Sequence, residues 1–396
     1  MAVRYCSKLP AGAELVVVGG GVAGAATAFH AARAGLDVLL LERRPALCTL
    51  TTAVATGGFR LQLDDPEELR LVRESVALFG ELAASGERDY DPRVRRRGYL
   101  YLTTSHDGAA RQRELVAAQR SWGLDDVELL PGEQARRAFP FVAPEVVQAR
   151  FRAADGLLDP KALTFGLAAA SGARVAVGCG VTGVRATGGR VELATTRGTV
   201  AADVVVVAAG PFSAEVAALA GVELPLANVR RHKLVLPEAP EVPAHAPMTV
   251  DDDTGAHWRP LLGGAALLFP DDDEPPAAAV EDVPVDHRFA FRLLDPASPA
   301  AVARTAPFWR QVWRRGAADW FLQAGQYTLT PDRRPLIGPT PVPGLYVNCG
   351  YGGHGVMVAP AGSRQLIDLV TGTLPAAANP FRLDRPLVPR PRLERL

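Results

Sequence analysis

Near its N-terminus the chain alternates short, wholly apolar runs with turns and with a segment of small residues. Residues 16–18 are all valine, a glycine-rich turn follows, small side chains dominate residues 23–28, and a second apolar run covers residues 38–41. Continuous apolar runs are typical of parallel strands buried on both faces, and small side chains let a helix pack closely against such strands. The pattern predicts strand, glycine turn, helix and strand over residues 14–42.

Further along, the chain carries many short apolar or alternating runs that are separated by Pro, Gly and Asp. Runs of this kind are typical of antiparallel strands, and we expect them to form a second, sheet-based domain. They cover residues 97–104, 229–236, 248–250 and 262–269. Between them, strand patterns return at 175–177, 191–193 and 203–210, and the last of these ends in a small-residue turn that suits close approach of a cofactor.

The first turn has the spacing of a dinucleotide-binding motif. Gly19, Gly21 and Gly24 allow a tight turn, close approach of a pyrophosphate and close helix packing, while the helix N-terminus offers N–H donors. Glu42 follows at the end of the next strand, where a carboxylate accepts hydrogen bonds from a ribose 2′-OH and repels the extra phosphate of NADP. FAD or NAD therefore fits this motif. A glycine turn that binds nothing would leave the placement of Glu42 unexplained.

Two later segments are also candidates for cofactor contact. Residues 48–62 form a loop rich in small and hydroxyl side chains, which either lies against a cofactor or simply connects two elements. Residues 350–355, GYGGHG, repeat the glycine spacing ahead of an apolar helix. Because the remaining tail is too short for a second strand-helix-strand unit, we expect a glycine-lined helix start that faces the same cofactor.

Length and charge narrow the function classes. The 396 residues exceed what one compact core usually spans, so two domains are expected, and 43 basic residues balance 43 acidic ones. This balance argues against nucleic acid or an anionic membrane as a partner. No apolar run approaches the roughly 20 residues of a bilayer span, and the N-terminus lacks a signal-peptide core. We therefore expect a cytoplasmic protein without a membrane span.

Neither the cysteines nor the acidic clusters indicate a metal site. The four cysteines lie far apart without CxxC spacing, which is typical of reduced thiols. The acidic runs at residues 251–253 and 271–274 are typical of solvated loop charges, because neighbouring residues in a run rarely converge on one ion. We expect no metal.

The order of these motifs resembles the FAD-dependent D-amino acid oxidase superfamily, most closely its sarcosine oxidase and dehydrogenase branch. The motifs are GGGVAG with Glu42, the strand that ends in VAAG at 207–210, the segment GQYTLTPDRRPLIG at 325–338 and the cluster at 350–355. The segments DGLLDP at 155–160 and HWRP at 257–260 are similar as well, so the resemblance spans nearly the whole chain.

The resemblance implies an α/β fold in which a Rossmann-like FAD-binding domain, of the D-amino acid oxidase type, carries an inserted antiparallel β-sheet substrate domain. We expect the FAD-binding domain to combine residues 1–85, 146–222 and 325–396, and the substrate domain to combine residues 86–145 and 223–324. The implied chemistry is oxidation of a C–N bond in an amine or amino acid, secondary and N-methyl amines above all. It proceeds by hydride transfer from the carbon next to nitrogen to flavin N5.

The family pattern also implies individual site residues. Those expected to contact FAD are Gly19, Gly21, Val22, Ala23, Gly24, Glu42, Arg43, Thr51, Thr52, Thr56, Gly57, Gly58, Arg60, Val181, Ala209, Gly210, Gly325, Gly353, His354, Gly355, Val356 and Met357. Those expected to form the substrate site are Tyr327, His354, Arg259, His257, Tyr351 and Arg60. Structural interpretations remain open: Arg259 as an exposed hairpin arginine, Tyr327 as a core residue and His354 as a hydrogen-bonded structural histidine.

The chain departs from the sarcosine oxidases at several places. They tether FAD to a cysteine just before the Tyr-Thr of the late segment, where this chain has Gly325 and Gln326, so we expect noncovalent FAD. Met357 and Leu63 stand where those oxidases carry a lysine and an arginine that bind a carboxylate. Residues 263–268 contain no lysine where those oxidases carry their oxygen-activating lysine. A small free amino acid therefore loses two expected anchors, and the missing lysine favours a dehydrogenase, or else an oxidase that uses another positive group.

Two other functions stay open at this point. The first glycine motif alone also fits an NAD-dependent dehydrogenase, and the missing cationic residues fit a flavin-containing electron-relay subunit of a larger complex. The expected partners are a small amine or amino acid as substrate and, as electron acceptor, another protein or a quinone. The sequence predicts neither the identity of the substrate nor the oligomeric state.

Overall fold

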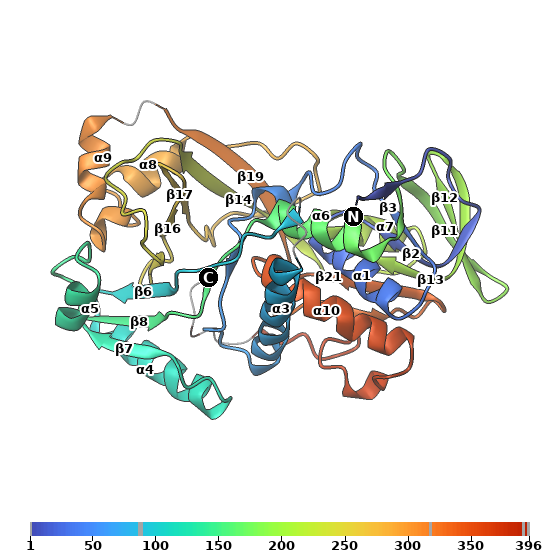
Figure 1. Cartoon of the computed structure of the whole chain (residues 1–396), viewed down its shortest axis with the longest axis horizontal. Coiled ribbons are helices and arrows are strands. Elements are labelled where there is room, and N and C mark those ends of the chain that lie inside the picture. The colour runs from blue at the N-terminus through green and yellow to red at the C-terminus, as the bar shows by residue number, and fades with distance from the viewer. Residues whose placement is uncertain (1, 86–89, 317–318, 390–392, 394–396) are drawn as a thin grey trace.

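The computed structural model describes residues 2–85, 90–316, 319–389 and 393. Two nine-stranded sheets organise these residues and lie at opposite ends of the long axis (Figure 1). A small third sheet joins β4 (Gly58–Phe59), β9 (Gly156–Leu157) and β5 (Arg95–Arg96). The architecture is the mixed α/β arrangement that the motifs predicted.

The first sheet has a parallel centre. Its parallel strands, in spatial order, are β1 (Arg4–Tyr5), β10 (Arg174–Ala176), β3 (Val38–Leu41), β2 (Gly12–Val18), β13 (Gly198–Val207) and β21 (Leu345–Cys349). The antiparallel strands are β12 (Arg190–Thr195) and β11 (Val181–Thr187), which continue from β13, and β20 (Leu336–Pro339), which pairs with β21. The apolar runs predicted from the sequence form the buried centre of this sheet.

Helices cover the parallel strands and form the largest core with them. They are α1 (Val22–Arg33), α2 (Thr51–Val54), α3 (Pro66–Ala84), α6 (Pro160–Ser171) and α10 (Gly355–Val370), while α7 (Ser213–Ala218) contributes Ala217 to a second core on the other face of the sheet. The helix α3 begins at Pro66, because the Asp65 carboxylate accepts hydrogen bonds from the N–H groups of Glu67 and Glu68, and Pro66 occupies the first helical position.

The second sheet is mainly antiparallel. Its strands, in spatial order, are β18 (Pro276–Ala277), β14 (Ala227–Leu236), β17 (Ala265–Leu268), β16 (His257–Pro260), β15 (Met248–Asp251), β6 (Tyr99–Thr103), β8 (Gln148–Arg152) and β7 (Glu128–Pro131). The long strand β19 (Phe321–Leu329) pairs with β14, and β15 pairs with β6 in parallel.

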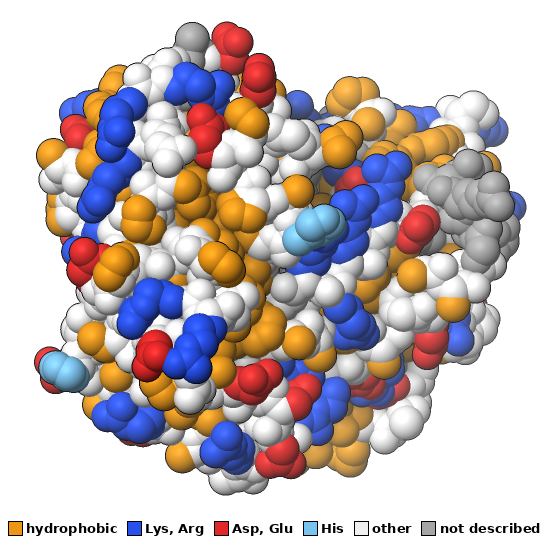
Figure 2. All heavy atoms as spheres, turned by 60° about the vertical axis from the view of Figure 1, so that its left-hand side comes forward, with side chains coloured by type: hydrophobic (Ala, Val, Ile, Leu, Met, Phe, Trp, Pro, Cys, Tyr) orange, Lys and Arg blue, Asp and Glu red, His pale blue; other side chains and the backbone are white. Residues whose placement is uncertain are grey.

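Shorter helices accompany the second sheet. They are α4 (His106–Ser121), α5 (Gly132–Ala138), α8 (Arg288–Leu294) and α9 (Trp309–Arg315). The 3-10 turns among the described residues include η2 (Gly210–Phe212), η3 (Val302–Arg304) and η4 (Ala376–Ala378). An aromatic core packs α8 and α9 against one face of β14, β16 and β17. Basic and acidic side chains are interspersed on the outer surface at this end (Figure 2).

Strand pairing bears on the expected domain boundaries. The expected limits at residues 146 and 325 would assign β8 and part of β19 to the FAD-binding domain, although β8 pairs with β6 and β19 pairs with β14. We therefore propose that the substrate domain extends through β8 and β19, since ladder hydrogen bonds hold both strands in the second sheet. The expected limit between residues 85 and 86 falls at the edge of the described residues. Among the described helices, none is long and apolar enough to cross a membrane.

Candidate cofactor and substrate site

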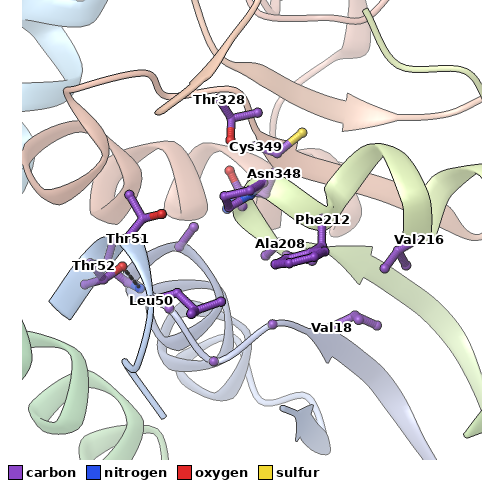
Figure 3. A pocket seen from close by; sticks show the side chains of 18 of the residues that line it. Val18, Leu50, Thr51, Thr52, Ala208, Phe212, Val216, Thr328, Asn348 and Cys349 are labelled. Carbon is purple, nitrogen blue, oxygen red and sulfur yellow. Dashed lines mark hydrogen bonds between the residues drawn. The ribbon is translucent and has the colours of Figure 1, made fainter. Parts of the chain in front are cut away.

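The carboxyl ends of the central parallel strands border a cavity of about 340 Å³. Gly19 follows β2, Glu42 follows β3 and Ala208 follows β13, and all three line this space. Thr51, from α2, lies on the opposite side of the cavity from Phe212 (Figure 3). Ligands of open parallel sheets bind at this edge, so the cavity is the candidate cofactor site.

The glycine turn leaves its backbone open towards this cavity. Gly19 has φ of +120°, and a Cβ there would lie 2.4 Å from the carbonyl oxygen of Ala208. A Cβ on Gly24 would lie 1.8 Å from the carbonyl oxygen of Gly19, so α1 approaches the turn this closely only with glycine. The helix α1 begins after Gly21 without a side-chain cap. Its N-terminus therefore fits a pyrophosphate, because the first N–H groups of a helix attract anions.

Glu42 holds the glycine turn in place. Its Oε2 accepts a hydrogen bond of 2.7 Å from the N–H of Gly20, and its Oε1 accepts one of 2.8 Å from the N–H of Arg44. Burial raises the pKa of Glu42, and these two hydrogen bonds oppose the rise. Beside it, the guanidinium of Arg43 stacks on Phe212, with Cζ 3.6 Å from the ring centroid. Sequence reasoning predicted Glu42 as a ribose ligand, and the structure adds this role in the turn.

A smaller cavity of about 90 Å³ adjoins the first. The two share the lining residues Val22, Thr51, Thr52, Gly352 and Gly355. The smaller one extends from these to β14, β17 and β19 of the second sheet, where Lys233, Leu268 and Tyr327 line it. The two cavities together therefore run from the end of the first sheet to the face of the second, as an extended dinucleotide with a reactive ring at one end requires.

One face of the second sheet carries the predicted substrate residues. Directly paired residues of an antiparallel ladder point to the same side of a sheet. His257 pairs with Leu268, which pairs with Lys233, and Arg259 pairs with Ala266 on the same strands. This face meets the glycine loops of the first domain, because a Cβ on Gly353 would lie 2.7 Å from the Tyr327 ring.

A buried chain of three side chains connects α3, α10 and the loop after β4. Nδ1 of His354 lies 3.1 Å from Oε2 of Glu68, and Nε2 lies 3.2 Å from Nη2 of Arg60. A guanidinium only donates hydrogen bonds, so Nε2 of His354 is the acceptor and Nδ1 carries the proton that Glu68 accepts. Sequence reasoning identified His354 and Arg60 but missed Glu68. Its signal in the sequence was a charged residue one turn before Leu71 and Val72, on the apolar face of the segment that forms α3.

Burial shifts the pKa values of several polar side chains on the substrate face. Burial, with the Arg60 charge adding to it, lowers the pKa of His257 to about 4, so this imidazole is neutral near pH 7. Its Nδ1 donates to the carbonyl oxygen of Gly255 at 2.8 Å, which leaves the lone pair on Nε2. Burial raises the pKa of Tyr99 to about 12 and also raises that of Tyr327, so both phenols keep their protons.

Tyr351 does not join the other predicted substrate residues through its hydroxyl. That hydroxyl donates to Oδ1 of Asn348, whose amide donates to Thr27 and Ser363 at 2.9 Å each. Burial raises the pKa of Tyr351 well above its usual value. The ring borders the larger cavity while the hydroxyl belongs to a network between β21, α1 and α10. We therefore assign Tyr351 to the wall of the cofactor site and no longer propose it as a substrate-binding group.

Lys233 is the residue that sequence reasoning overlooked on the substrate face. The segment 263–268 contains none of the three lysines, as the sequence shows, but β14 pairs with β17 and sets Lys233 opposite Leu268 at the end of that segment. Strand pairing between residues far apart in sequence carries no local signal. The site therefore contains a lysine after all, from the neighbouring strand.

The predicted site residues fall into two groups, those that line a cavity and those that line neither cavity. Those that line one or both cavities are Gly19, Gly21, Val22, Ala23, Glu42, Arg43, Thr51, Thr52, Thr56, Gly57, Gly58, Val181, Ala209, Gly210, Gly325, Tyr327, Tyr351, Gly353, Gly355 and Val356. Those that line neither are Gly24, Arg60, His257, Arg259, His354 and Met357. The described residues form no cluster of His, Cys, Asp or Glu that could hold a metal ion.

Comparison with known proteins agrees with this geometry. The family model DAO, described as FAD dependent oxidoreductase, matches residues 14–369. The chain is 28% identical to a D-amino acid dehydrogenase of Cereibacter sphaeroides over 91% of this chain and 92% of that one. It is also 28% identical to the sarcosine oxidase subunit beta of an Arthrobacter species, over 94% of this chain and 90% of that one.

Solved structures agree as well. A glycine oxidase from Geobacillus kaustophilus superposes with a TM-score of 0.81 at 25% identity, over 95% of this chain and 99% of that chain. The likeness covers both sheets, so the fold expected from the sequence is confirmed.

Proposed function

This chain belongs to the DAO family of FAD dependent oxidoreductases, and we propose that it oxidises a C–N bond of an amino acid, with secondary and N-methyl amines preferred. One observation carries the proposal. Arg259 lies on the substrate face, and its side chain has no hydrogen-bond or ion-pair partner among the described residues, with Nε fully buried. An arginine keeps its charge even when buried, and a carboxylate matches its fork of donors.

The residues of the larger cavity fit FAD. The open backbone at Gly19 and Gly21 and the carboxylate of Glu42 would hold the ADP half. Thr52 and Gly353, which line the smaller cavity, would surround the ring system. When bound, FAD supplies the electron acceptor, because its flavin N5 takes a hydride from a carbon next to nitrogen.

We further propose that FAD is bound without a covalent tether. Gly325 lines the smaller cavity, and a Cβ there would lie 2.6 Å from Cγ2 of Val54. The strand β19 thus approaches α2 too closely for a larger side chain at this position unless α2 shifts. Denaturation with acid should release the flavin into the supernatant, and a flavin that stays with the precipitated protein would contradict this proposal.

The side chains of the substrate face have separate roles in binding and in proton transfer. Arg259 binds the substrate carboxylate, and the protonated hydroxyls of Tyr99 and Tyr327 donate hydrogen bonds to the substrate. Nε2 of the neutral His257 accepts the proton that a substrate ammonium must lose before its nitrogen lone pair can assist departure of a hydride. These roles need no further ionisable group.

The electron acceptor is the second part of the proposal. The absence of a lysine from 263–268 and the similarity to a D-amino acid dehydrogenase support a dehydrogenase that passes electrons to a protein or a quinone. Lys233 supports the second candidate, an oxidase, because it offers a positive charge beside the smaller cavity.

One experiment separates these candidates. The purified protein is supplied with N-methyl and cyclic amino acids, with 2-hydroxy acids as controls, in an oxygen electrode and again with an artificial electron acceptor. We expect turnover of amines with the acceptor and little oxygen consumption. Oxygen consumption at the same rate would establish the oxidase, and turnover of hydroxy acids alone would refute C–N oxidation.

A further inference from the structure

The smaller cavity is bordered by cations and by no carboxylate among the described residues. Arg231 and Lys233 line it from the same strand, two residues apart. The positive charge of Arg231 is balanced by protein groups. Its Nη1 donates to the carbonyl oxygen of Asp271 at 2.8 Å, and its Nη2 lies 3.8 Å from Oδ1 of Asp272. Arg231 therefore has no need of an anion from a ligand.

The positive charge of Lys233 is not balanced in this way. Its ammonium has no hydrogen-bond or ion-pair partner among the residues that the structure describes. The charged groups that act on it are those of Arg259 and Lys161, and both are cations. Burial and these two charges lower the pKa of Lys233 to about 8, which is how a partly buried ammonium responds when its neighbours repel it.

Arg259 is the second uncompensated cation. It lies on the same face as Lys233 across the intervening strand β17, where their partners Ala266 and Leu268 are two residues apart. The carboxylate of Asp159 acts on it from a distance, but that carboxylate accepts the N–H groups of Lys161 and Ala162 at the start of α6. Two neighbouring cations without acidic partners destabilise an empty site, and a bound anion removes that penalty.

We propose that the substrate carries a second carboxylate, which Lys233 binds while Arg259 binds the carboxylate next to the amine. The substrate class is then an amino dicarboxylate, or an N-substituted amine with two carboxylate arms. This inference rests on the proposed function, because it takes the substrate face as the place where the amine binds. A monocarboxylic amino acid would neutralise only one of the two cations.

The test uses unreactive carboxylates, so that binding is measured without turnover. The FAD-loaded protein is titrated with glutarate, which has two carboxylates, and with butyrate, which has one, and binding is followed by the change in the flavin absorbance spectrum. A charged hydrogen bond in a partly buried site typically changes affinity about 10–100-fold. We expect glutarate to bind the unmodified protein more tightly than butyrate by about this factor.

Variants assign the effect to Lys233. Lys233→Met should weaken glutarate binding about 10–100-fold and leave butyrate binding within about twofold, while Lys233→Arg should retain most of the glutarate affinity. Arg259→Met should weaken both ligands. Lys8→Met, at an exposed lysine, is the matched control and should change neither. Equal affinities for glutarate and butyrate, or an equal loss of both in Lys233→Met, would overturn the inference.

The two proposals fail in different ways. If no amine reduces the flavin but glutarate binding depends on Lys233, C–N oxidation is refuted and the dianion site stands. If monocarboxylic amines reduce the flavin as efficiently as amino dicarboxylates do, with no effect of Lys233→Met on their KM, C–N oxidation stands and the dianion site is refuted.

Discussion

Nδ1 of His354 lies 3.1 Å from Oε2 of Glu68, and both side chains are buried between α3 and the N-terminus of α10. The same imidazole accepts a hydrogen bond from Arg60 through its other nitrogen. Glu68 thus acts through His354 on the guanidinium that lies 5.8 Å from the Tyr99 ring centroid on the substrate side. We regard Glu68 as a positioning residue, because it lines neither cavity and acts only through His354.

Glu68→Ala removes the acceptor that fixes the His354 tautomer. We expect kcat to fall about 10–100-fold with little change in KM, since a misoriented Arg60 affects the reacting geometry more than carboxylate binding. Glu68→Gln keeps an acceptor oxygen for Nδ1 and should restore most of the rate. Steady-state kinetics on FAD-loaded protein measures both values, and a loss that Glu68→Gln does not rescue would contradict the positioning role.

Glu42→Ala removes two hydrogen bonds from the glycine turn as well as the expected ribose ligand. Both effects lower FAD affinity, and the loss of charged hydrogen bonds predicts a decrease of about 10–100-fold. Fluorescence titration of the apoprotein with FAD measures the dissociation constant. Glu14→Ala, which removes a carboxylate that caps the exposed N–H of Asp37, is the control and should leave FAD affinity unchanged.

Two glycine-to-alanine substitutions, one in α1 and one in α3, can be compared directly. Gly24→Ala places a Cβ 1.8 Å from the carbonyl oxygen of Gly19, so α1 must move, and overpacking of this kind costs about 1–3 kcal/mol. Gly80→Ala, on the exposed side of α3, meets nothing within 4 Å and should stabilise the protein by about 1 kcal/mol. Thermal unfolding with and without FAD tests both. An unchanged or raised Tm in Gly24→Ala would show that the turn is not packed as described.

The charge of Lys233 predicts the pH dependence of dicarboxylate binding. Its pKa of about 8 means that the ammonium is present below this pH and is lost above it, so affinity for glutarate should fall as pH rises through about 8. The charged and titratable groups around it are Arg259, Arg231, Lys161 and Tyr327. Lys233→Arg should move the fall to higher pH. Affinity that stays constant between pH 7 and about 9.5 would contradict an interaction with the ammonium.

Local sequence patterns predicted what depends on neighbours along the chain. The valine run of β2, the glycines of the first turn and Glu42 after β3 are specified within one strand-helix-strand unit, and the structure has them as predicted.

The parts that were missed depend on contacts between distant segments. Lys233 joins the site only because β14 pairs with β17, and Glu68 meets His354 across 286 positions of sequence. Tyr351 stands in the glycine cluster, which predicts a substrate residue, but its hydroxyl donates to Oδ1 of Asn348 in the core. Neither strand register nor the direction of a buried hydroxyl can be read from a single sequence without an alignment.

The central claim is that this chain uses FAD to oxidise the C–N bond of an amino acid. The most direct measurement is the visible absorbance of the purified protein under anaerobic conditions before and after an amino acid is added. We predict a flavin band that bleaches with secondary or dicarboxylic amino acids and not with the corresponding 2-hydroxy acids. A protein that neither contains nor takes up FAD, or a flavin band that no amine bleaches, would contradict the account.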